Sequence, residues 1–162
     1  MTGATAARYK EEDTPKAQKF NLKTPYMKQG RVTQLVAETP NMWIHCKINA
    51  EGGENEIHTH LDEDHSFIVL EGEMSVFNEK GDEMKLKKWE GVLLPKGAYY
   101  RYLNTGEGNL VVLRIGSIVR DKPKQGQATR VTPTGEEILG GSVENKSLPA
   151  IYMEKFFADE AR

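Results

Sequence analysis

The chain has 162 residues, of which 38% are hydrophobic and 28% charged, with 22 Lys plus Arg against 24 Asp plus Glu. This length and composition indicate one folded domain, and the net charge of −2 disfavours nucleic acid and anionic membranes as partners. No apolar run approaches the roughly 20 residues that span a bilayer, and the N-terminal stretch lacks the apolar core of a secretory signal, so we expect a cytoplasmic protein.

Residues 1–20 show no apolar period and are predicted to form a mobile N-terminal arm. From Val32 onward, short apolar or alternating runs recur, and each is closed by Gly, Pro, Asn or Asp, which is typical of antiparallel strands. The predicted strands lie near residues 32–36, 42–48, 55–60, 65–71, 73–78, 83–87, 91–94, 99–103 and 110–115. Because no long helical period interrupts them, residues 21–120 are predicted to form an all-β sandwich or closed barrel.

The C-terminal extension, residues 121–162, divides into two parts. Residues 121–134 are rich in Lys, Gln, Pro and Gly and are predicted to form a connection or exposed loop. The segment 150–161 carries an apolar cluster that needs burial on the barrel or on a neighbouring subunit. Its members are Ile151, Tyr152, Met153, Phe156 and Phe157.

The four histidines are unevenly distributed, and three of them, His58, His60 and His65, fall within eight residues. Strand alternation places His58 and His60 on one face, about 6 to 7 Å apart at Cα. If residues 61–64 form a hairpin loop, His65 lies opposite His60, and Phe67 lies opposite His58. Three imidazoles on one face predict a metal site with positions open for water or substrate.

The acidic stretch Asp62, Glu63 and Asp64 leaves three interpretations open. These carboxylates could accept hydrogen bonds from the N–H groups of metal-bound imidazoles. They could also form only a solvated turn, or stabilise protonated imidazolium in place of a metal.

Side-chain alternation along the strands indicates further pocket residues. If His65 faces inward, Phe67 does too, and Tyr102 follows Tyr100. On the strand before the histidines, Trp43, His45 and Lys47 share one face, but the sequence alone does not decide which face looks inward. His45 is expected to be structural rather than catalytic, and the lone Cys46 to be a reduced, partly buried thiol. Arg114 and Arg101 are candidates for holding a carboxylate through a bidentate pair. The pocket residues that we nominate are Phe67, Tyr102, Arg114 and Trp43.

The spacing of these residues resembles the two motifs of the cupins, which are small double-stranded β-helix, jelly-roll-like barrels. Gly52, His58, His60, His65 and Gly72 match the spacing of the first motif, with His65 where glutamate is usual. The second motif is matched by Pro95, Gly97 and Asn104, with Trp89 in place of its first glycine and Tyr100 in place of its histidine.

The resemblance implies one divalent metal inside the barrel, held by His58, His60 and His65, with Tyr100 at the fourth position. We expect Tyr100 to act as a pocket residue that hydrogen-bonds metal-bound water or substrate, because a phenol with a pKa near 10 is a poor ligand. Ferrous iron is the favoured metal, with manganese, nickel or zinc as alternatives. Cupins are often dimers, so the resemblance also implies a homodimer.

Three functions follow from these expectations. The leading one is a non-haem iron dioxygenase-type oxidoreductase that acts on a small organic molecule through a three-histidine site. The second is a metal-dependent lyase or isomerase in which Tyr100 transfers a proton while the ion acts as a Lewis acid. The third is a non-catalytic sensor or small-molecule binding protein, because a barrel does not by itself fix a function.

Overall fold

The computed structural model describes residues 15–118, 130–138 and 148–159, and all regular structure in these ranges is β-strand. No helix in these ranges is long and apolar enough to cross a membrane. The strands are β1 (Thr24–Gln29), β2 (Arg31–Thr39), β3 (Met42–Asn49), β4 (Gly53–His60), β5 (Glu63–Glu71), β6 (Glu73–Phe77), β7 (Glu83–Lys87), β8 (Gly91–Leu94), β9 (Tyr100–Asn104), β10 (Leu110–Ile118), β11 (Arg130–Val131) and β12 (Ile151–Phe157).

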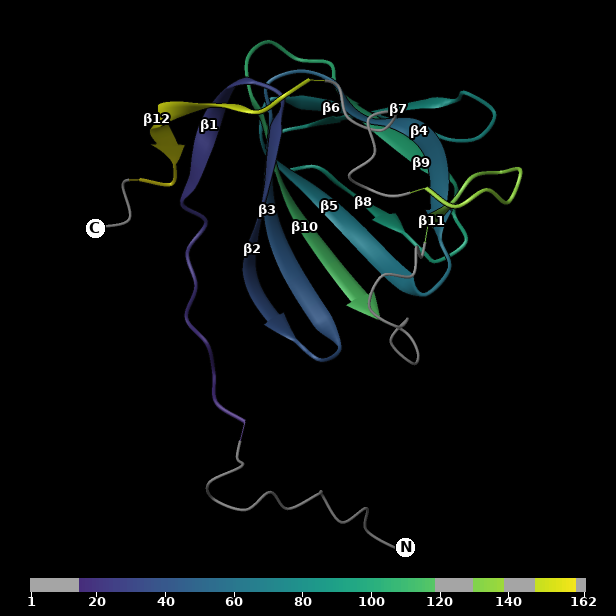
Figure 1. The fold of residues 1–162 in the computed structure, drawn as a ribbon, viewed down its shortest axis with the longest axis horizontal. Helices are drawn as coiled ribbons and strands as arrows, with labels where there is room; N and C mark the ends of the chain where they lie inside the picture. The colour runs from purple at the N-terminus through teal and green to yellow at the C-terminus, as the bar shows by residue number, and fades with distance from the viewer. Residues whose placement is uncertain (1–14, 119–129, 139–147, 160–162) are drawn as a thin grey trace, which may run out of the picture.

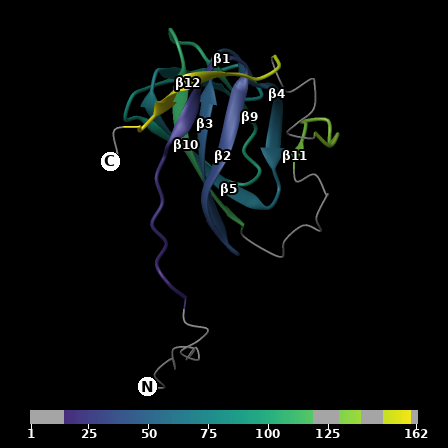
Figure 2. The same cartoon turned by 60° about the vertical axis from the view of Figure 1, so that its left-hand side comes forward.

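Two five-stranded antiparallel sheets form the barrel (Figures 1 and 2). The first has the strand order β2-β3-β10-β5-β8, and the second β11-β4-β9-β6-β7. The predicted all-β, double-stranded β-helix fold is therefore confirmed, and each of the nine predicted strands has a counterpart. Strands β1, β11 and β12 were not predicted. Arg130 and Val131 belong to a segment predicted to be an exposed loop, which is wrong for these two residues because they pair with β4.

The main core lies between the two sheets, as strand alternation requires. Its buried members include Phe67, Val69, Tyr100, Tyr102 and Val112. Phe67 and Tyr102, both predicted to face inward, are fully buried and lie 5.2 Å apart between ring centroids. The inner face of the first sheet is thus aromatic as well as aliphatic.

A second, smaller core lies on the outer face of the first sheet. Cys46, Ile48 and Val111 point to this face and pack with Met27 of β1. Strand β12 pairs with β1, and its Phe157 packs against this core, so part of the predicted C-terminal apolar cluster covers the barrel of its own chain. The segment before β1, drawn in purple, has no regular structure from residue 15 to residue 23 and descends beside β2 (Figure 1). Residues 1–14 of the predicted arm lie outside the described residues.

Trp89, in the turn between β7 and β8, adopts a backbone conformation that suits glycine. Its φ angle is +74°, and 72% of its surface is exposed. A bulky residue in the left-handed region is strained because its Cβ lies too close to the following carbonyl oxygen. This position is the one at which the second cupin motif has glycine, so the departure from the motif carries a conformational cost.

We therefore predict that Trp89→Gly stabilises the protein by about 1 kcal/mol, because it relieves the left-handed strain and removes little packing. Chemical denaturation of both proteins would measure the free energy of unfolding. Gly81→Ala is a matched control that adds the same kind of strain. The φ of Gly81 is +86° and an added Cβ meets no atom within 4 Å, so only backbone strain should destabilise this variant. A Trp89→Gly protein that is less stable than the parent would contradict the strain argument.

Candidate metal centre

The predicted site residues meet at one end of the barrel. His58 and His60 end β4, and His65 lies near the start of β5. Tyr100 begins β9 and is paired directly with His58. Arg114 comes after the buried residues Val111 and Val112 on β10 and lies nearer to this end of the barrel.

The predicted hairpin between His60 and His65 is wrong. Strand β4 pairs with β9 and β11, whereas β5 pairs with β10 and β8, so the two strands belong to different sheets. Strand β5 begins at Glu63, and only Leu61 and Asp62 connect the strands. This short connection turns the chain from one sheet to the other and still brings His60 and His65 together, with ring centroids 4.1 Å apart.

The strand partners of Phe67 also differ from those predicted. Phe67 does not lie opposite His58 but is paired with Arg114 on one side and Val92 on the other. It therefore belongs to the inner face of the first sheet, beside the histidine cluster.

His60, Glu63 and His65 offer three ligand atoms that all lie within 4.8 Å of one another. One carboxylate oxygen, Oε2 of Glu63, lies 3.2 Å from Nδ1 of His60 and 2.8 Å from Nε2 of His65. All three side chains are largely shielded, since Glu63 is 17% exposed and the two histidines are buried. Among the described residues, this is the group of His, Cys, Asp or Glu side chains that is compatible with a divalent metal ion.

Burial controls the protonation of this cluster. Desolvation lowers the pKa of His60 to about 3 and that of His65 to about 4, although hydrogen bonds to Glu63 oppose this shift. Burial alone would raise the pKa of Glu63, but hydrogen bonds from His60 and His65 hold it below its usual range. At neutral pH the cluster therefore contains two neutral imidazoles and one carboxylate.

Two arginines determine which ring nitrogens carry the protons. Nη2 of Arg114 lies 2.8 Å from Nδ1 of His65, and Nε of Arg130 lies 3.3 Å from Nε2 of His60. A guanidinium can only donate, so these outer nitrogens accept, and the ring protons point inward to Glu63.

The donor set fits a divalent ion. When two ligand atoms each lie about 2.1 Å from an ion and subtend a right angle at it, they are about 3.0 Å apart. The distances from Oε2 of Glu63 to the ring nitrogens of His60 and His65, 3.2 and 2.8 Å, are close to this value. A metal-bound neutral imidazole carries its proton on the outer nitrogen, where it needs an acceptor. Binding of an ion would therefore require Arg114 and Arg130 to withdraw from the histidines.

His58, which was also predicted to be a metal ligand, lies outside this group. Its Nδ1 is 2.8 Å from the carbonyl oxygen of Glu56, to which it donates, and its buried Nε2 has no hydrogen-bond partner. The nearest charged atom to this nitrogen is Oε2 of Glu54, at 3.4 Å. His58 thus faces Glu54 and the ring of Tyr100, whose centroid is 4.6 Å away.

Glu54 connects this end of the barrel to the core. Its carboxylate is 3.1 Å from Nζ of Lys47, 3.5 Å from the hydroxyl of Tyr100 and 3.7 Å from Nη2 of Arg130. Lys47 and Glu54 are both buried, and desolvation lowers the pKa of Lys47 to about 7, opposed by the charge of Glu54. Burial raises the pKa of Tyr100 above its usual value, which keeps the phenol neutral.

The structure shows which face of β3 points into the barrel. Trp43, His45 and Lys47 face the barrel interior, where the Trp43 ring stacks on His45 at 4.5 Å and lies 4.7 Å from the guanidinium of Arg114. Gly116 provides the space for this indole, because a Cβ at this position would lie 2.0 Å from the Trp43 ring. Arg101, the other arginine candidate, instead lies over Phe77 and donates to the carbonyl of Asn55.

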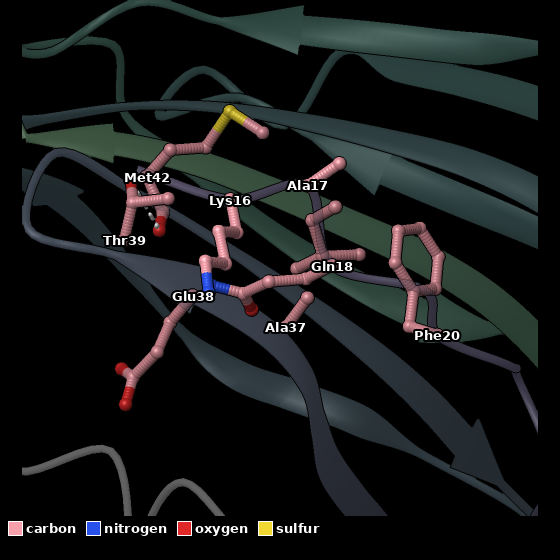
Figure 3. A pocket seen from close by; sticks show the side chains of 9 residues that line it. Lys16, Ala17, Gln18, Phe20, Ala37, Glu38, Thr39 and Met42 are labelled. Atoms are coloured by element: carbon pink, nitrogen blue, oxygen red, sulfur yellow. Dashed lines mark hydrogen bonds between the residues drawn. The ribbon is translucent and has the colours of Figure 1, made fainter. Parts of the chain in front are cut away.

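An apolar cavity of about 280 Å³ lies elsewhere on the molecule (Figure 3). It is open to solvent on one side and is lined by Lys16, Ala17, Gln18 and Phe20 of the N-terminal segment and, in the hairpin of β2 and β3, by Ala37, Met42 and Ile44 among others. None of the histidine-cluster residues lines it. The cavity is therefore separate from the candidate metal centre.

The model of the cupin domain family matches residues 45–116, which span β3 to β10 and contain the histidine cluster. The chain belongs to the cupin superfamily. No match was found among curated proteins. Two residues that match the second cupin motif hold turns in place. Gly97 N–H donates to the carbonyl of His60, and Asn104 Nδ2 donates to the carbonyls of Asn49, Ala50 and Gly108.

Solved structures resemble this cupin in fold. KdgF from Halomonas sp. is 24% identical, with a TM-score of 0.51 over 57% of this chain and 82% of that one. An uncharacterized protein with a double-stranded β-helix domain from Klebsiella pneumoniae is 16% identical, with a TM-score of 0.55 over 66% and 95%. The cupin domain of Cnp3 from Schizosaccharomyces pombe is 19% identical, with a TM-score of 0.50 over 57% and 67%. At these identities the likeness shows the fold alone.

Sequence reasoning did not identify three residues of this cupin site. Glu63 was considered only as a hydrogen-bond acceptor for imidazole N–H groups, as a turn residue or as a counter-charge for imidazolium, although it follows His60 closely enough to share a ligand set. Glu54 lies before the histidines on the same strand, with the inward parity of His58 and His60. Arg130 is 70 positions from His60 in the sequence, and no local signal links the two.

The low pKa values of the buried histidines predict acid sensitivity. His45, His60 and His65 have folded-state pKa values of about 3 to 4, below the unfolded value of 6.5, so the unfolded chain binds more protons between these values. The free energy of unfolding of the metal-free protein should therefore fall as pH drops below 6.5, by up to about 1.4 kcal/mol per pH unit for each histidine.

This dependence can be measured by urea denaturation between pH 7 and pH 4.5 in the presence of a chelator. His65→Gln should flatten the slope, because it removes one titrating group. An unfolding free energy that is independent of pH over this window would contradict the assigned protonation.

Proposed function

We propose that this cupin is a metal-dependent enzyme acting on a small organic molecule, with the ion held by His60, Glu63 and His65. The observation that carries the proposal is the convergence of two imidazoles and one carboxylate within 4.8 Å at the end of the barrel. Two histidines and one carboxylate with open positions are the ligand set of non-haem iron oxygenases, so ferrous iron and dioxygenase-type oxidation are favoured. A ferrous ion would supply the electron transfer to dioxygen that this class of reaction needs.

The proposed ligand set replaces His58 of the sequence-based set with Glu63. The carboxylate contributes one negative charge, which favours retention of a divalent cation among the neighbouring positive charges. His58 instead lies beside Tyr100 and Glu54 on the inner face of the second sheet.

Tyr100 supports the reaction as a neutral hydrogen-bond donor. Its hydroxyl lies 3.5 Å from Nε2 of His60 and is fully buried, and its raised pKa opposes ionisation. A neutral phenol at this place can donate to an oxygen atom of water or substrate beside the ligands, and its burial keeps bulk water from competing.

Metal binding tests the ligand set directly. Anaerobic titration with ferrous salt should give one ion per chain, and Glu63→Gln or His60→Ala should weaken binding by at least about tenfold, because each removes a ligand. Asp62→Asn is the matched control, since it removes a carboxylate from the same corner but not from the cluster. Equal loss in all three variants would show only a general charge effect.

Activity provides the second readout. Oxygen consumption by the ferrous protein, screened over small organic acids and aromatic compounds, should depend on His60 and Glu63. Turnover that survives in His60→Ala at the parental rate would exclude this site from the reaction. Turnover that persists with zinc and without oxygen would contradict the oxidative assignment.

The position of Arg130 generates a further prediction. Because its guanidinium donates to the outer nitrogen of His60, Arg130→Gln should increase the affinity for divalent ions by at least about threefold. The variant removes a positive charge and allows the outer nitrogen to carry the proton. Calorimetric titration with zinc would measure this gain, and unchanged or weaker binding would contradict the assigned tautomer.

A further inference from the structure

Among the described residues, Arg114 is a buried cation without a carboxylate partner. It is only 5% exposed, and among the residues that the structure describes no carboxylate lies within ion-pair distance of it. Other interior cations differ, since Lys47 and Arg130 both lie beside Glu54. A buried charge is costly unless an opposite charge or several hydrogen bonds compensate for it.

In the metal-free protein, the guanidinium of Arg114 is held in a fixed orientation. It lies 4.7 Å from the ring centroid of Trp43 and 5.6 Å from that of Phe67, and Nη2 donates to His65. Its Nε is buried and has no hydrogen-bond partner. Contacts on three sides therefore leave one N–H group oriented but unused, which reduces the entropic cost of binding an acceptor there.

Within the ranges that the structure describes, His45 provides a second buried polar atom without a hydrogen-bond partner, on the strand next to that of Arg114. It is paired directly with Arg114 across β3 and β10, so the two side chains project from one face about 5 Å apart at Cβ. The Nδ1 atom of His45 is buried without a partner, and the ring is held by stacking on Trp43. Burial lowers the pKa of His45 to about 4, so the ring is neutral and can place its proton on Nδ1.

We propose that Arg114 and His45 form a binding site for the carboxylate group of a small organic acid. The Nε–H of Arg114 and the Nδ1–H of His45 donate to the two oxygens, and the positive charge of Arg114 is neutralised by the ligand. Two neighbouring donors match a planar carboxylate, whereas a tetrahedral phosphate would leave most of its oxygens without donors.

This inference deepens the proposed function, on which it rests for the role of the acid as substrate, but binding of the acid itself requires no metal. Arg114 contacts both this site and the ring of His65 in the metal cluster. A carboxylate held there would lie beside the metal ligands. The substrate class is thus a carboxylic acid whose reacting part extends from Arg114 toward His60, Glu63 and His65.

The test uses the full-length protein in the presence of a chelator, so that failure of metal binding does not affect it. Acetate and benzoate are titrated to about 50 mM, far above a Kd of about 1 mM for a weak site, with acetamide and benzamide as uncharged counterparts. The Nε–H resonance of Arg114, assigned by its loss in Arg114→Lys, reports binding by NMR. We expect a saturable shift with at least one acid and none with the matching amide.

Three variants separate this site from a general charge effect. Arg114→Lys keeps the charge but removes the Nε–H donor and should weaken binding at least about tenfold, followed through the Trp43 resonance. His45→Phe keeps the ring stacked on Trp43 and should weaken it about threefold. Arg101→Gln is the control, because Arg101 also lies over an aromatic ring but outside the site.

The proposal is overturned if amides bind as well as acids, if inorganic phosphate binds more tightly than either acid, or if no acid shifts the Arg114 resonance. Equal losses in Arg101→Gln and Arg114→Lys would also overturn it. Thermal unfolding of each variant establishes that it is folded, and His45→Phe keeps the test decisive if Arg114→Lys is not. Carboxylate binding without metal binding would disprove the proposed function alone.

Discussion

The buried ion pair of Lys47 and Glu54 joins the two sheets and is the constraint on which the polar end of the barrel depends. Lys47 comes from β3 of the first sheet, and Glu54 from β4 of the second. Neither charge reaches solvent, and the ammonium lies 4.9 Å from the ring centroid of Tyr102. A pair of this kind contributes little net stability, but loss of one partner typically costs about 3 to 5 kcal/mol because the other remains buried and charged. The pair therefore fixes the relative position of the sheets more than it stabilises them.

The charges at this end of the barrel suit both proposed sites. Glu54 compensates Lys47 and Arg130, while Glu63 accepts hydrogen bonds from two histidines. In the described part of the chain, Arg114 has no carboxylate within ion-pair distance. The proposed anion and the proposed cation would carry opposite charges and would therefore attract one another.

Much of the fold was predictable because strand alternation is local. Phe67 and Tyr102 followed from parity once His65 and Tyr100 were placed inward, and the nine strands from 32 to 115 were predicted from runs and turns. Strand β1 contains Pro25 and lacks alternation, and β11 has only two residues, so neither has a strong periodic signal.

The candidate site was less predictable because it depends on pairing between distant strands. Short polar connections occur both in hairpins and in corners between sheets, so residues 61–64 gave no means of distinguishing the two. The clustering of His60 with His65 was predicted, but through the wrong geometry, and a correct corner was needed to bring Glu63 between them. Arg130 reaches His60 only through the pairing of β11 with β4.

The pairing of β1 with β12 has a consequence for the order of folding during synthesis. All strands of the barrel from β2 to β10 have been translated by residue 118, whereas β12 begins at residue 151. The outer apolar face formed by Cys46, Ile48 and Val111 must therefore wait for Phe157 to emerge from the ribosome. Until β12 is available, the β1–β12 sheet cannot form, and this hydrophobic face is only partly covered.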